Sequence, residues 1–186
     1  MTIIKKQLSY LKENYLFILI SIGIFLFFSI VGFIFPFFKE EIFEIFNELT
    51  KMFKGLNFFQ TFLLIFFNNA RTSLTGLVFG IFAGIFPLII LMANGYIIGV
   101  ISKIVSSERS FFELIKLLPH GIFELPAVFI SMALGLKIGF VFLSEISFKK
   151  AVLELERALK IFVLIILPLL IIAAIIETFL IFFLSS

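Results

Sequence analysis

Cysteine and tryptophan are absent from this 186-residue sequence, histidine occurs once, and charged residues make up only 15% of the chain. Without cysteine, neither disulfides nor thiolate metal ligands are available. The charged fraction is well below that of a soluble domain. The sequence also contains no serine or cysteine nucleophile with its base, no phosphate-binding loop and no nucleic-acid surface, so we expect no catalytic residues of these kinds and no nucleic-acid partner.

Apolar residues dominate instead. They form 62% of the sequence, 30 of them are phenylalanine, and the mean hydropathy is +1.24. The run 15–38 contains no charge and, at about 1.5 Å per helical residue, is longer than a hydrocarbon core of roughly 30 Å. It is also longer than the apolar region of a signal peptide, which favours a retained anchor. The sequence therefore predicts an integral membrane protein in the cell membrane.

The hydrophobic pattern predicts an all-α, polytopic transmembrane bundle in one domain that covers residues 1–186. The five predicted membrane segments are 15–38, 56–73, 74–102, 119–142 and 161–184. Two further stretches, 39–55 and 145–160, mix charged residues with apolar residues at helical spacing. This pattern is typical of amphipathic helices at the membrane surface.

Two of these segments leave alternatives open. The segment 56–73 has only 12 leading apolar residues before Asn68, which favours a broken or re-entrant helix over a simple span. The segment 74–102 is long enough to span and is expected to bend at Pro87. If 56–73 crosses the membrane, the positions of lysine and arginine place the N-terminus in the cytoplasm and the C-terminus outside; if it is re-entrant, the last spans reverse.

Glycines recur at intervals of four within the apolar segments. Small residues at this spacing let helix backbones approach closely in lipid, which favours packing between helices of one chain. A homodimer that uses the same faces is the alternative. The glycines concerned are Gly76, Gly80, Gly84, Gly95, Gly99, Gly135 and Gly139.

Seven polar residues interrupt the apolar segments. Each needs a partner, because an unpaired polar group in hydrocarbon is unfavourable by several kcal/mol. They are Asn68, Asn69, Arg71, Asn94, His120, Glu124 and Glu177. One interpretation is a polar centre in which Arg71 pairs with Glu124 or Glu177. A second is a zinc site of His120, Glu124 and Glu177 with a water molecule. A third is a path for protons or ions.

The element Pro119-His120-Gly121 followed by Glu124-Leu125-Pro126 is the most distinctive of these features. Together with Asn68-Asn69-x-Arg71, the glycines from Gly76 to Gly135 and Glu177, it resembles the stage II sporulation protein M family over residues 15–184. The resemblance implies a membrane protein with five spans. In spore-forming bacteria the family's namesake is a non-catalytic member of a complex that recruits cell-wall-degrading enzymes.

Relatives of that family occur in archaea that do not sporulate, so the resemblance does not imply sporulation here. We expect a non-enzymatic scaffold that organises a complex or shapes the bilayer, with the stretches 39–55 and 145–160 contacting lipid or other membrane and peripheral proteins. The alternatives are a transporter or ion-conducting protein and a metal-dependent enzyme. No cofactor is predicted, except that zinc would accompany the metal-binding interpretation.

Overall fold

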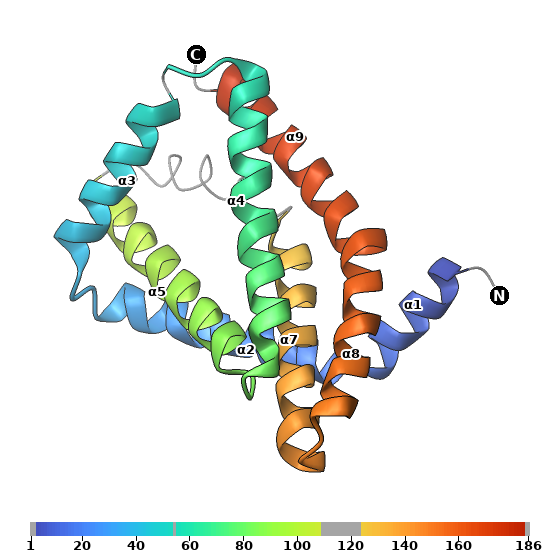
Figure 1. Ribbon diagram of the computed structural model, residues 1–186. Helices are drawn as coiled ribbons and strands as arrows, with labels where there is room; N and C mark the ends of the chain where they lie inside the picture. The colour runs from blue at the N-terminus through green and yellow to red at the C-terminus, as the bar shows by residue number, and fades with distance from the viewer. Residues whose placement is uncertain (1–2, 54, 109–123, 185–186) are drawn as a thin grey trace.

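The computed structural model of the chain describes residues 3–53, 55–108 and 124–184 (Figure 1), and these residues form helices without any strand. Among these described residues, five helical stretches are long and apolar enough to cross a membrane. This confirms the predicted all-α membrane bundle. The spans are α2 (Tyr15–Ile34), α4 (Phe58–Val78) with a 3-10 turn (Phe79–Ile81), α5 (Ile85–Glu108), α7 (Leu125–Glu145) and the apolar part of a last helical rod.

That last rod consists of α8 (Phe148–Ile161), a π-helical turn (Phe162–Ile166) and α9 (Leu167–Leu184). Pro168 lies two residues after the end of the π turn and lacks the N–H that a regular α-helix would use there, which accounts for the local change in hydrogen bonding. The stretch predicted at 145–160 is thus amphipathic, but it continues the direction of the last span and is not a separate element lying flat on the membrane (Figure 1).

In the described part of the chain, two shorter amphipathic helices lie outside the spans: α1 (Ile3–Glu13) and α3 (Lys39–Phe53). They occupy opposite ends of the bundle (Figure 1). We call one end of the bundle the α1 end; it carries α1, the turn between α4 and α5, and the loop between α7 and α8. The end that carries α3, the start of α4 and the end of α9 is the α3 end.

The predicted boundary at residue 73 is wrong. Helix α4 begins at a capping box of Asn57 and Gln60 and continues without a break past Asn68 and Ser73. The chain reverses later, at residues 79–84, where Ala83 (φ 54°) and Gly84 (φ 73°) adopt the left-handed backbone. Polar side chains can be placed on a helix, whereas a reversal requires a change of backbone conformation, so the break follows the backbone and not the polar residues.

The two prolines at the starts of spans do not bend them. Pro87 is the third residue of α5 and Pro126 the second residue of α7. A missing N–H is tolerated in the first turn because those groups have no partner within the helix. The expected bend at Pro87 is therefore absent. The residues 119–123, predicted to begin the fourth segment, lie outside the described part of the chain.

Glycines lie where two backbones meet. A Cβ atom on Gly95 or Gly99 of α5 would collide with the backbone of α2 at Phe25 or Ser29. The predicted run Gly76, Gly80, Gly84 does not share one helix, because these residues belong to α4, the 3-10 turn and the reversal that follows.

The same type of contact joins the reversal to α7. A Cβ on Gly80 would collide with the backbone of Gly135, and one on Gly139 would collide with the backbone of Ala83 and Gly84. Gly76 also faces α7, where the side chain of Met132 fills the space above it. The turn between α4 and α5 thus lies directly on the middle of α7.

The largest buried cluster joins α4, α7 and the last rod. Its fully enclosed side chains include Leu77, Ile138, Ile161, Ile166 and Leu170. Long apolar side chains elsewhere on the spans remain exposed on the outside of the bundle, as expected where lipid and not water is the surrounding solvent.

Candidate functional site

The predicted polar residues only partly come together. A cavity of about 250 Å³ lies between α3, α4, α7 and α9, and its polar lining comes from two asparagines and two glutamates. These residues are Asn68, Asn69, Glu124 and Glu177. The amide Nδ2 of Asn69 donates a hydrogen bond to Oε2 of Glu124. We call this site the carboxylate cavity.

The local structure explains how these side chains meet. Glu124 is the N-cap residue of α7, where the helix dipole favours a carboxylate. Asn69 lies more than half-way along α4, and Glu177 lies in α9 about two turns before its end. Glu177 is surrounded by apolar residues of its own helix, whereas Asn69 belongs to the polar stretch 68–73 of α4. The side-chain oxygen atoms of the four polar residues that line the cavity could bind a proton or a hard cation.

Two predicted members of the polar centre lie elsewhere. Arg71 follows Asn69 by two residues, a rotation of about 200° around a helix, so it points away from the cavity. Its side chain is exposed, and it forms no ion pair with Glu124 or Glu177 within the described residues. Asn94 is exposed on α5, where its Nδ2 donates to the carbonyl oxygen of Ile90 at 2.8 Å.

His120 lies outside the described residues, so the predicted zinc set of His120, Glu124 and Glu177 stays a prediction. The two glutamates of that set line one cavity. Within the described part of the chain, no three histidine or acidic side chains are grouped closely enough to hold a metal ion.

A second polar cluster at the α1 end was not predicted from the sequence. Nζ of Lys137, on α7, lies 3.1 Å from Oε2 of Glu154, on α8, and both side chains are largely buried, with 15% and 12% of their surface exposed. The hydroxyl of Tyr10, on α1, donates to Glu154 and accepts a hydrogen bond from Lys137 Nζ at 2.9 Å. The ammonium also lies 4.1 Å from the centre of the Tyr10 ring.

Burial raises the pKa of Tyr10 well above its usual range, and the hydrogen bond to the carboxylate of Glu154 raises it further. The phenol therefore stays protonated and remains a hydrogen-bond donor. The signal that could have revealed this cluster is the position of Lys137, a charge inside the predicted apolar segment 119–142.

We predict that this cluster fixes α1 and α8 to α7. Lys137→Gln should lower the free energy of unfolding by about 1–3 kcal/mol, because it removes the ammonium from the largely buried Oε2 of Glu154, while Arg157 remains 2.7 Å from Oε1. The double variant K137Q/E154Q should recover part of that loss. Unfolding in detergent, followed by circular dichroism, measures both effects.

The matched control is the pair Lys150 and Glu145, whose Nζ and Oε2 lie 2.7 Å apart with both side chains at least half exposed. Its removal should change the stability by less than about 1 kcal/mol. A loss for Lys137→Gln no greater than that of this control would show that the buried cluster does not hold the helices together.

Comparison with known proteins identifies the family of the chain. No curated protein and no solved structure matches it. The family model described as "Stage II sporulation protein M" matches residues 18–180, which include the five spans almost entirely. The matched region contains both the carboxylate cavity and the Lys137–Glu154 pair. The chain therefore belongs to the stage II sporulation protein M family of multi-pass membrane proteins.

Proposed function

We propose that this protein is a non-enzymatic scaffold that organises a complex in the membrane, and that α3 is its main contact with a partner. The observation that carries the proposal is the acidic face of α3. Four glutamates of this amphipathic helix are exposed, and the helix lies outside the spans. They are Glu40, Glu41, Glu44 and Glu48.

The start of α3 is held in place by α5. The hydroxyl of Tyr96 donates to the carbonyl oxygen of Phe35 at 3.0 Å and accepts from the N–H of Phe37 at 2.9 Å. The ring of Phe38 packs edge-on against that of Tyr96, with centroids 6.3 Å apart. A charged helix fixed in this way presents a defined surface, which reduces the entropy lost when a partner binds.

The family resemblance supports the same proposal, since the namesake of the family is a non-catalytic member of a complex. A partner that recognises α3 needs a basic surface complementary to the four glutamates. The distribution of charge also supports an orientation. Lysine and arginine gather at the α1 end, so we infer that this end and the N-terminus face the cytoplasm and that α3 lies on the other side. The basic residues concerned are Lys5, Lys6, Lys12, Lys149, Lys150, Arg157 and Lys160.

The test compares two sets of exposed glutamates in native membranes. The α3 variant E40Q/E41Q/E44Q/E48Q should lose the complex, seen as a band well above the 21.3 kDa chain in native electrophoresis after mild solubilisation. The control E145Q/E156Q, at the α1 end, should keep it. A wild-type chain that migrates alone, or a complex that survives in the α3 variant, would refute the proposal. Equal melting temperatures would show that all three proteins are folded.

The carboxylate cavity favours a second candidate function, passage of protons or small cations. Glu177 lies within a membrane-spanning helix and Glu124 caps the start of another, and ionisable groups at such places usually serve a function or a partner. In proteoliposomes with a pH-sensitive or cation-sensitive dye, the wild-type chain should carry a flux that Glu124→Gln and Glu177→Gln each reduce about tenfold or more, whereas Glu156→Gln leaves it unchanged. No flux above empty liposomes would exclude this function.

A further inference from the structure

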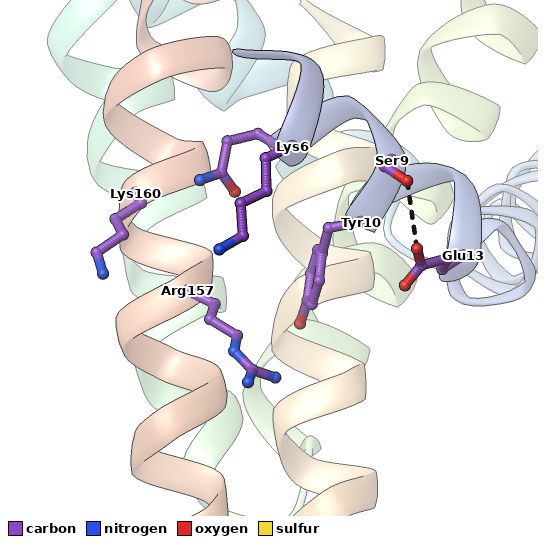
Figure 2. A pocket seen from close by; sticks show the side chains of 7 residues that line it. Lys6, Ser9, Tyr10, Glu13, Arg157 and Lys160 are labelled. Carbon is purple, nitrogen blue, oxygen red and sulfur yellow. Dashed lines mark hydrogen bonds between the residues drawn. The ribbon is translucent and has the colours of Figure 1, made fainter. Parts of the chain in front are cut away.

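A second cavity, of about 470 Å³, lies between α1 and α8 at the α1 end. Its lining includes Lys6 and Tyr10 from α1 and Arg157 and Lys160 from α8. Figure 2 shows that the side chains of Lys6, Tyr10 and Arg157 extend into the space between the two helices, while Lys160 lies at the edge of the same helix as Arg157. The Lys137–Glu154–Tyr10 contacts fix the distance between the helices that form this cavity.

The cavity has an excess of positive charge. Lys6 forms no ion pair or hydrogen bond within the described residues, and Arg157 uses Nη1 to bond Oε1 of Glu154 at 2.7 Å, which leaves its other N–H groups available. Glu13 is the acidic residue of the described lining, and its Oε1 accepts from Ser9 at 3.2 Å. The lining thus carries three cations and one carboxylate, and Glu154 beside it balances part of the charge of Arg157. The remaining positive charge suits an anion that accepts several hydrogen bonds, such as a phosphate.

The cavity also adjoins an apolar groove. Lys160 lines both, and beyond it the groove of about 460 Å³ is formed chiefly by Leu159, Val163 and Leu164, with Glu156 at its side. Val163 and Leu164 belong to the π turn at which the apolar part of the last span begins. The basic cavity and the apolar groove thus lie one after the other along the helix, with the charged part toward the end of the bundle.

The apolar residues of α1 form an exposed face that could contact lipid beside the cavity. Ile3, Ile4 and Leu8 are 70%, 56% and 52% exposed, and α1 leads directly to the first span at Tyr15. An amphipathic helix with such an exposed apolar face lies at the boundary between headgroups and acyl chains. On this principle we expect the cavity between α1 and α8 at the level of the headgroups.

We propose that this cavity binds the phosphate of an anionic phospholipid, with Lys6, Arg157 and Lys160 as the cationic contacts and an acyl chain along Val163 and Leu164. The adjoining apolar groove favours a lipid over free phosphate, because a soluble anion would make no use of it. This binding site is independent of the scaffold function proposed for α3, which lies at the opposite end of the bundle.

Native mass spectrometry of the full chain in detergent tests the proposal, with phosphatidylglycerol and phosphatidylcholine of the same acyl chains as probes. The wild-type chain should retain one phosphatidylglycerol at least tenfold better than phosphatidylcholine. The variant K6Q/K160Q should bind phosphatidylglycerol about 10- to 30-fold more weakly, given the usual contribution of a lysine near an anionic lipid.

The variant K149Q/K150Q is the matched control, because it removes two exposed lysines of α8 that lie outside the cavity. It should bind phosphatidylglycerol within about twofold of the wild type. All four lysines are exposed, so both variants should melt at the wild-type temperature.

Several results would overturn the proposal. Equal retention of phosphatidylglycerol by K6Q/K160Q and the wild type would show that the cavity is not the site. An equal loss in both variants would show diffuse attraction to the basic end of the protein. Displacement of the lipid by an equal concentration of glycerol phosphate would show that the groove contributes nothing and that the site takes a soluble anion.

Discussion

The direct contact between the backbone of the α4–α5 turn and that of α7 determines how the whole chain crosses the membrane. Helices in lipid gain little from burying apolar surface against one another, so their association relies on close packing. Here Gly80 lies on Gly135, and Gly139 lies on Ala83 and Gly84, at distances that no side chain larger than hydrogen would allow. The turn is thereby fixed on α7, and α4 and α5 become two separate crossings.

The reversal between α4 and α5 also separates the α1 end of the bundle from the α3 end. With α4 and α5 as separate spans, α1 and α8 come together at one end and α3 lies at the other. The buried pair Lys137 and Glu154 joins α7 to α8, and Tyr10 adds α1 to the pair. The carboxylate cavity lies nearer the other end of α7, at its first residues. One span thus carries two polar sites that are about 13 residues, or roughly 20 Å, apart along the helix axis.

The class of protein and the number of spans could be predicted from the sequence, because long uncharged runs have few physical interpretations. The position of the break could not. The residues from Phe79 to Ile85 are as apolar as a span, so hydropathy gives no sign of a turn, and the polar residues 68–73 suggested one where the helix continues. The left-handed backbone at Ala83 and Gly84 depends on the contact with α7, which lies some 50 residues further along the chain.

The candidate site shows a similar limit. Residue type alone suggested that Arg71 pairs with a glutamate, but the rotation of α4 that directs Asn69 to Glu124 directs Arg71 away from it. Lys137 was visible in the sequence as a charge inside an apolar segment, yet its partners come from residues 10 and 154, which no local pattern connects. Pairings between distant helices depend on helix rotation and depth, and a hydropathy pattern specifies neither with sufficient accuracy.

The five-crossing arrangement, with α1 and α8 opposite α3, can be measured directly because the chain has no cysteine of its own. Single cysteines at Ser144, which is exposed at the end of α7, and at Gly55, where a side chain meets nothing within 4 Å, report on the two ends. A membrane-impermeant thiol reagent should label Gly55→Cys in intact cells and Ser144→Cys only after the membrane is opened. Labelling of both positions from the same side would contradict the arrangement.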